Sequence, residues 1–394
     1  MTIQYDPFSD EALDDPLDLY RRLRDEAPCY FIEARNAWAI SRFQDLVDAH
    51  ADTQHFTAVH GTMPWDVMRG SRNAPSMLHQ MDPPQHTQVR RAVFPWFGKD
   101  AIEKHRGQVE ILATALVDNA AQRGEFDMVH DIAWPLAAQV TALICGLPHE
   151  DAVLFKELTE KSVERVPGVN GQTPEGGAAL GEVVVYLIEK VKARRAAGFD
   201  GDSMIDLFGR LEVDGEPIGD DVAIALQMMM FVVGGSSQFP KGFGALAYRL
   251  FANPEQRAEL AANPSLAVPA FIEALRIDNP TQMLGRTVAE PTQIHGQNLE
   301  PGQGVLFLYA SAGRDEREFP DPERFDIHRD PPRTLSFGSG PHACIGRGFG
   351  MFQADILSRV LLQRMPEYVI ETAGLEVIKS EYMRGWVTLP TRVS

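Results

Sequence analysis

Cys344 is the residue whose surroundings in this sequence most strongly suggest chemistry. Gly338, Gly340 and Pro341 precede it, two further glycines follow it, and an apolar segment with helical spacing comes next. Glycine lets a backbone adopt left-handed turns and approach a large flat ligand closely. Backbone N–H groups aimed at the sulfur, together with the positive end of the next helix, would lower the pKa of the thiol. The residues predict a thiolate that binds a metal; a buried structural cysteine in a glycine-rich turn is the alternative.

The loop around Cys344 resembles the cysteine loop of the cytochrome P-450 superfamily. The matching residues are Phe337, Gly338, Gly340, His342, Cys344 and Gly346. The resemblance implies that Cys344 is the ligand of the iron of haem b and that Phe337 and His342 also bind the cofactor. It covers nearly the whole chain. It therefore implies one haem-thiolate domain over residues 1–394, with a triangular, mainly α-helical fold and a smaller β lobe.

Two cationic or hydrogen-bonding side chains are expected to share one face of a helix that begins near residue 85. His86 and Arg90 are four residues apart, so both can contact the same carboxylate. Taken alone, such a pair belongs more often to a solvated face. The resemblance implies instead that His86 and Arg90 bind a haem propionate, and that Arg286 and His342 complete the binding of the two propionates.

A long helix is predicted over residues 221–251, which are apolar nearly all round, as expected of a helix inside a protein core. Pro240 lies within it, removes one N–H and displaces the carbonyl of Ser236, so a kink is predicted there. A kink that serves packing alone is the alternative. The resemblance implies that this stretch forms a groove for dioxygen, and its catalytic positions would be Gly234, Gly235, Ser237 and Gln238.

The pair Ser237 and Gln238 departs from the superfamily pattern. An acidic residue and a threonine usually stand at these positions and relay protons during oxygen activation. Glutamine can hold a water molecule, but its amide does not titrate near neutral pH. Proton delivery is therefore the step at which this sequence is expected to differ.

Two further groups of residues are assigned through the resemblance. Glu273 and Arg276 lie three residues apart on one helical face, and Arg324 is expected to join them in a structural core below the haem. The residues expected to line the substrate pocket are Met230, Val233, Met283 and Leu284. Strands are predicted at residues 37–40 and 304–309, in the small sheet of the β lobe.

Composition limits the classes of partner. The formal charge of −18 over 394 residues disfavours nucleic acid and anionic membranes. Three cysteines, Cys29, Cys145 and Cys344, do not form a disulfide framework, which fits a reducing cytoplasm. No apolar span opens the chain, and the run at residues 223–233 is judged too short to cross a bilayer.

The function expected from the resemblance is oxygenation of a small apolar organic molecule, by hydroxylation or O-dealkylation, in the cytoplasm. O₂ would be the oxidant, and a separate ferredoxin with its ferredoxin reductase would supply the electrons. Two alternatives remain open because the acidic residue is missing. One is a peroxygenase or another haem-thiolate catalyst, such as a dehydratase or isomerase, and the other is a haem-binding ligand sensor or carrier without turnover.

Overall fold

Helices dominate the structure, a computed structural model that describes residues 3–69, 77–164, 166, 169–213, 215–329, 331 and 333–393. The longer helices are α7 (Arg106–Arg123), α8 (Trp134–Cys145), α9 (Ala152–Ser162), α10 (Pro174–Ala197), α12 (Asp221–Ala252), α14 (Ala267–Ile277) and α16 (Arg347–Arg364). The shorter ones are α1 (Asp10–Asp14), α2 (Leu17–Glu26), α3 (Phe43–Ala51), α4 (Pro64–Arg69), α5 (Gln85–Val93), α6 (Lys99–Glu103), α11 (Met204–Arg210), α13 (Pro254–Ala262) and α15 (Tyr309–Ala312). The predicted fold class, mainly α with a smaller β part, is confirmed.

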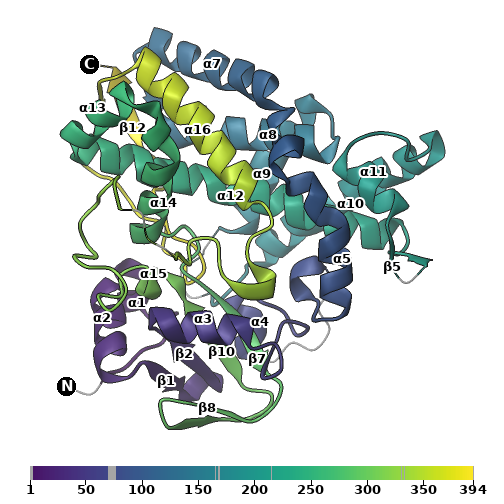
Figure 1. Cartoon of the computed structure of the whole chain (residues 1–394), viewed down its shortest axis with the longest axis vertical. Coiled ribbons are helices and arrows are strands. Elements are labelled where there is room, and N and C mark those ends of the chain that lie inside the picture. The colour runs from purple at the N-terminus through teal and green to yellow at the C-terminus, as the bar shows by residue number, and fades with distance from the viewer. Residues whose placement is uncertain are drawn as a thin grey trace.

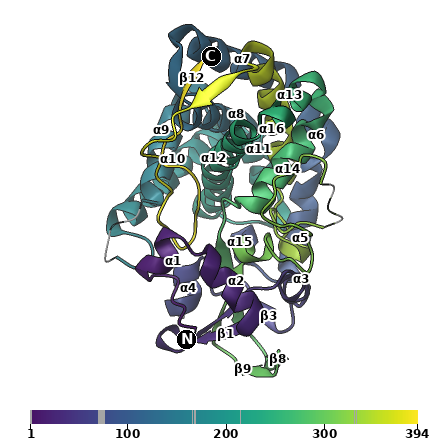
Figure 2. The same ribbon diagram turned by 90° about the vertical axis from the view of Figure 1, so that its left-hand side faces the viewer.

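The long helix α12 runs through the middle of the helical part and packs against α8, α10 and α14 (Figure 2). Its N-terminus is capped by Asp220, whose carboxylate accepts hydrogen bonds from the N–H groups of Val222 and Ala223. The helix continues unbroken through Pro240 and ends one residue later than predicted. Because it is apolar on most faces, it can be surrounded by other helices along much of its length.

A five-stranded sheet lies in the lower part of Figure 1, together with the short helices α2, α3 and α4 and below the long helices. Its order is β1 (Cys29–Ile32), β2 (Ala37–Ile40), β10 (Gly304–Leu308), β7 (Met283–Val288) and β3 (Phe56–Thr57). The predicted strands at residues 37–40 and 304–309 are confirmed as β2 and β10, except that Tyr309 begins α15. Every residue of β10 is buried, which fits its place at the centre of the sheet.

Smaller sheets complete the structure. A three-stranded sheet has the order β11 (Tyr368–Ile370), β12 (Pro390–Val393) and β4 (Glu125–Asp127). Two hairpins are formed by β5 (Glu212–Val213) with β6 (Glu216–Pro217) and by β8 (Thr292–Ile294) with β9 (Gln297–Leu299). The first hairpin precedes α12. In the three-stranded sheet, β12 from the C-terminal segment pairs with β4, which directly follows α7.

Two stretches of the described chain are long and apolar enough to cross a membrane, namely Met128–Cys145 and the whole of α12. The prediction that residues 223–233 are too short considered only part of α12, which is 32 residues long. In the most apolar windows, 67% of the first stretch and 44% of α12 are buried inside the protein. Core helices of globular proteins meet the same criteria, so length and hydropathy do not assign either helix to a bilayer.

Candidate active site

Cys344 lies in a loop between a short 3₁₀ turn, Gly340–His342, and the start of α16. Gly338 has φ 68° and Gly340 has φ 64°, both in the left-handed region that glycine tolerates best. A Cβ on Gly340 would also come within 2.5 Å of the His50 carbonyl oxygen. The N–H of Cys344 donates to the carbonyl of Phe337 at 2.7 Å, which closes the loop. The predicted left-handed glycine turns are therefore present, and they hold the cysteine at the mouth of a helix.

The thiol of Cys344 accepts hydrogen bonds from the N–H groups of Gly346 and Arg347. Cys344 is open to the space beside it, yet the protein atoms that enclose the thiol outweigh these bonds and the charge of Arg90, so the pKa of the thiol is raised. The expectation of a lowered pKa is thus correct for the contribution of the N–H groups and wrong for the net shift in the protein alone. A metal ion reverses this balance, because it binds the thiolate and displaces the proton.

Four basic side chains from three elements meet near this loop. His86 and Arg90 come from α5, Arg286 from β7 and His342 from the 3₁₀ turn. The rings of His86 and His342 lie 4.1 Å apart between centroids. Burial, reinforced by nearby arginines, lowers the pKa of His86 to about 4 and that of His342 to about 2. Both histidines are therefore neutral at physiological pH while the two arginines stay charged.

These basic groups have almost no polar partners among the described residues. Arg90 donates to the carbonyl of Ala343 at 2.6 Å, and Arg286 donates to the carbonyl of Gly285 at 2.8 Å. Both ring nitrogens of His86 are buried and without a hydrogen-bond partner in the described part of the chain. A buried cation or imidazole without a partner is costly. The cluster fits an anionic group, and the thiol beside it fits a metal, so the residues present match the two propionates and the iron of a haem.

We expect Arg286→Ala to weaken haem retention, because a charge-assisted contact to a partly buried carboxylate contributes about 1.5–3 kcal/mol. The measurement is the rate at which purified holoprotein transfers haem to an acceptor protein. Arg91→Ala is the matched control, since Arg91 is exposed on the same helix as Arg90. Equal rates for Arg286→Ala, Arg91→Ala and the unchanged protein would remove Arg286 from the binding cluster.

The glycine pair of α12 has two different surroundings. A Cβ on Gly234 would meet no atom within 4 Å, so this glycine faces open space. A Cβ on Gly235 would come within 2.6 Å of Thr141 Oγ1 on α8. Gly235 therefore allows the two helices to approach closely, while Gly234 leaves room beside α12.

The side-chain amide of Gln238 is hydrogen-bonded to other residues of the protein. Its Nε2 atom donates to Tyr382 Oη at 3.1 Å and lies 3.4 Å from Ser237 Oγ, and its Oε1 atom accepts from Thr281 Oγ1 at 3.3 Å. The ring of Trp65, on α4, packs edge-on against Tyr382 with centroids 6.1 Å apart. Apart from the one with the neighbouring Ser237, these contacts join segments more than 40 residues apart, so the sequence did not indicate them. Gln238 thus links α12 to the C-terminal segment.

The residues predicted to line the substrate pocket do not all face the same region. Met230 and Val233 are half-buried on α12. Leu284 shares one face of β7 with Arg286, whereas Met283 lies on the opposite face and is 1% exposed in a core cluster with Leu306. The prediction that Met283 faces the substrate is therefore wrong, because strand alternation turns its side chain into the core.

Glu273 and Arg276 form a fully buried ion pair with a shortest distance of 2.8 Å. The third member is Arg329, whose Nε lies 3.0 Å from Glu273 Oε1. The side chain of Arg324 is 68% exposed and pairs with Asp326 at 3.6 Å, so the prediction that it joins Glu273 and Arg276 is wrong. Arg324 contributes only its carbonyl, which accepts from Arg276 at 3.4 Å.

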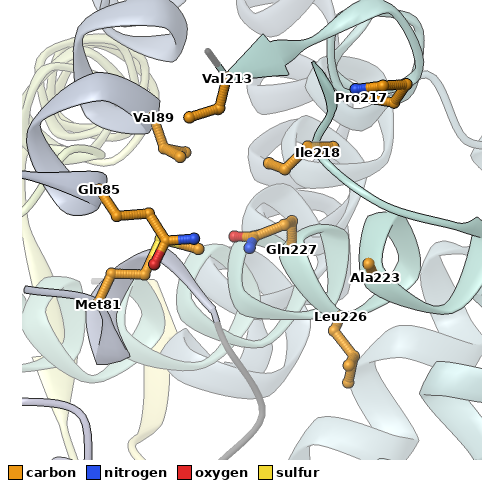
Figure 3. A pocket seen from close by; sticks show the side chains of 9 residues that line it. All are labelled: Met81, Gln85, Val89, Val213, Pro217, Ile218, Ala223, Leu226 and Gln227. Atoms are coloured by element: carbon orange, nitrogen blue, oxygen red, sulfur yellow. The ribbon is translucent and has the colours of Figure 1, made fainter. Parts of the chain in front are cut away.

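Two cavities lie beside the predicted site. One, of about 310 Å³, opens between α5, the β5–β6 hairpin and the first turns of α12, and Gln85 and Gln227 face each other across it (Figure 3). The residues predicted from sequence to form the substrate pocket do not line it. The other, of about 420 Å³, lies over the cysteine loop, with Arg333 and Arg347 among its lining residues.

Comparisons with known proteins agree with this arrangement. A family model described as cytochrome P450 matches residues 268–378. Cytochrome P450 123 of Mycobacterium tuberculosis is 31% identical over 98% of this chain and 96% of its own length. Cytochrome P450 monooxygenase PikC of Streptomyces venezuelae is 30% identical, with 96% of this chain and 91% of its own covered.

Solved structures show the same fold. The complex of CYP109E1 from Bacillus megaterium with testosterone superimposes with a TM-score of 0.88, covering 98% of this chain and all of the other, at 24% identity. At that identity the similarity is evidence for the fold alone.

Proposed function

This chain belongs to the cytochrome P450 family, and from that premise we propose that it inserts one oxygen atom from O₂ into a small apolar organic substrate, by hydroxylation or O-dealkylation. The observation that carries the proposal is the Cys344 thiol, which accepts from two backbone N–H groups and lies next to a largely buried basic cluster in which both ring nitrogens of His86 have no hydrogen-bond partner among the described residues. We propose that the cofactor is haem b and that the described chain forms one haem-thiolate domain.

In this proposal the haem is held by residues from both ends of the chain. Cys344 would ligate the iron, Phe337 would contact the haem, and the propionates would contact four basic residues, His86, Arg90, Arg286 and His342. The bound haem supplies the reductive activation of dioxygen. Gly234 would leave space for oxygen beside α12, because a side chain there would fill an open region, while Gly235 would let α12 approach α8 closely.

The substrate would bind beside α12. Met230, Val233 and Leu284 would give the pocket its apolar character, and Tyr382 with Gln238 would close it from the C-terminal segment. A relative from Mycobacterium tuberculosis named steroid C26-monooxygenase, 27% identical over 94% of this chain, supports an apolar substrate.

Electrons would come from a ferredoxin and its ferredoxin reductase. The groove of about 420 Å³ over the cysteine loop offers Arg347 on a chain whose formal charge is −18, while Arg333, which also lines it, pairs with Glu318 at 2.7 Å. A local cationic surface on an acidic protein suits a small acidic iron–sulfur protein. The three free cysteines support a reducing cytoplasm as the site of action.

The alternative proposal, a peroxide-using catalyst, is favoured by one observation. The amide of Gln238 is occupied by Tyr382 and Thr281, and neither Ser237 nor Gln238 can act as an acid near neutral pH. Peroxide would bring protons together with the oxidant.

A turnover experiment separates these functions. We expect purified holoprotein to form oxygenated product from a tight-binding apolar ligand when reduced ferredoxin and O₂ are present, and the product is identified by mass after labelling with ¹⁸O₂. Product with peroxide but not with ferredoxin would indicate the peroxygenase. Product with neither oxidant would indicate a dehydratase or isomerase, and spectral binding without any product would indicate a sensor or carrier.

A further inference from the structure

Lys241 is a lysine buried inside α12, one residue after Pro240, and only 2% of its surface is exposed. Its Nζ atom donates to the carbonyl of Ser237 at 2.7 Å and lies 4.7 Å from the ring centroid of Trp134 on α8. A Cβ on Gly385 would come within 3.0 Å of the Lys241 Cβ, so the C-terminal segment encloses the stem of the side chain. Lysine is almost never fully buried unless it is paired, and no carboxylate within 4.0 Å pairs with Lys241 among the residues that the structure describes.

The position of Lys241 relates it to the predicted oxygen groove. It lies one helical turn after Ser237, so both residues are on one face of α12. Ser237 stands where the family usually has an acid. The ammonium group of Lys241 thus contacts the backbone of the residue at which the titratable group is missing, and it comes from the same helix.

Charged groups that are partly exposed to solvent surround Trp134, the ring beside Lys241. Trp134 packs against Lys241 on one side, stacks on His130 with centroids 5.7 Å apart, and has Lys156 Nζ 5.7 Å from its ring centroid. Glu160, on α9, lies 3.2 Å from His130 Nδ1 and 3.7 Å from Lys156 Nζ. The side chains of His130, Lys156 and Glu160 are 26–32% exposed, so protons can be exchanged with water there.

These contacts set the charge states. Burial lowers the pKa of Lys241 to about 8, while the carboxylate of Glu160 acts in the opposite direction. The contact with Glu160 raises the pKa of His130. Burial acts to raise the pKa of Glu160, but the contacts of Glu160 with His130 and Lys156 outweigh burial, so the pKa of Glu160 is lowered. At neutral pH Lys241 is therefore protonated, yet it releases a proton more readily than a lysine in water.

We propose that Lys241 holds and supplies the proton that the family's acidic residue usually supplies to the oxygen groove, an inference that rests on the proposed function. The proton leaves Nζ for water admitted beside Ser237, and water in exchange with solvent returns a proton to the neutral amine. Only a proton moves, so no additional oxidant or reductant is required. Lys241 acts through Ser237 and water and is a positioning residue for the reaction.

The first measurement is a titration of the lysines themselves. The chain has eight lysines, so a holoprotein labelled with ¹³C at lysine Cε gives few signals, and Lys241→Met identifies the one from Lys241. In the diamagnetic carbon-monoxide form, we expect this signal to titrate near pH 8. A signal that does not change between pH 6.5 and 9.5 would overturn the inference, because the group would then not exchange its proton in the working range.

The second measurement is product formed per reduced nicotinamide consumed, with hydrogen peroxide release followed in parallel. Lys241→Arg retains the charge and donors but cannot release a proton at these pH values. A positioned proton donor contributes about 10²–10⁴-fold, so we expect Lys241→Arg and Lys241→Met to slow oxygenation about 10²-fold and to release more peroxide. Lys379→Met is the control, since Lys379 is an exposed lysine whose ion pair with Asp14 is at the surface.

The outcomes separate the possible explanations. Wild-type coupling and wild-type pH dependence in Lys241→Arg would show that the side chain is structural only. If the unchanged protein forms no product with either ferredoxin or peroxide, the proposed function is overturned. If it forms product and both Lys241 variants couple as well as it does, this inference alone is overturned. If neither variant binds haem, the test uses the unchanged protein. Its coupling, measured as a function of pH, must decrease as the pH rises, with the same midpoint as the NMR titration of Lys241. A different midpoint would reject the role of Lys241.

Discussion

Replacing Cys344 by serine is expected to abolish the red-shifted Soret band that a reduced, carbon-monoxide-bound haem shows when its iron is ligated by thiolate. A serine hydroxyl has a far higher pKa than a thiol and does not become an anionic ligand at neutral pH. The two N–H groups of Gly346 and Arg347 that now contact the sulfur would contact a neutral oxygen instead. The measurement is the difference spectrum of the reduced protein with and without carbon monoxide.

Cys29→Ser and Cys145→Ser are the matched controls for this experiment. Both residues are free and buried, and burial raises the pKa of each thiol to about 12, which makes them poor metal ligands. The thiolate band should persist in both variants. If Cys344→Ser kept the band while one of the controls lost it, the ligand would be the other cysteine.

Glu273→Ala is expected to lower the free energy of unfolding by about 3–5 kcal/mol, because it leaves the buried charge of Arg276 without its partner. The carboxylate of Glu273 accepts from Arg276 through both oxygens and also from Arg329 and from the N–H of Asp326. Both members of the central pair have side chains with 0% exposure, so water cannot replace the lost bonds. Chemical denaturation of the holoprotein, followed by circular dichroism, measures the change.

A comparison of two arginines tests the structural correction within the same experiment. Arg329→Ala should destabilise the protein by about 1–3 kcal/mol, because it removes one charged hydrogen bond to Glu273 but keeps the central pair. Arg324→Ala should change stability by less than about 0.5 kcal/mol, since its side chain is mainly in solvent. The reverse order, with Arg324→Ala the more damaging variant, would refute the assignment of Arg329 as the third member.

Local patterns in the sequence were enough for the features that depend on neighbouring residues. The glycines around Cys344 require left-handed backbone, which the structure contains at Gly338 and Gly340. The apolar stretch that predicted a helix over residues 221–251 is α12, because a helix that is apolar on most faces can only be stable inside a core. The spacing of Glu273 and Arg276 likewise places them on one face wherever the helix lies.

The sequence by itself thus determined the family, the cysteine loop and the main helix, whereas the tertiary structure decided which distant residues complete each site. Arg329 rather than Arg324 reaches Glu273, since the fold of the intervening segment, not its position in the chain, sets which side chain turns inward. The pairing of β7 with β10 fixes the side of the sheet on which Met283 lies. A shift of that pairing by one residue would move the Met283 side chain to the other side of the sheet. The partners of Gln238 and the burial of Lys241 also depend on the C-terminal segment and on α8, which come close to α12 only after folding. Burial and long-range contact set the charge of a group, so these properties cannot be read from a residue's neighbours in the chain.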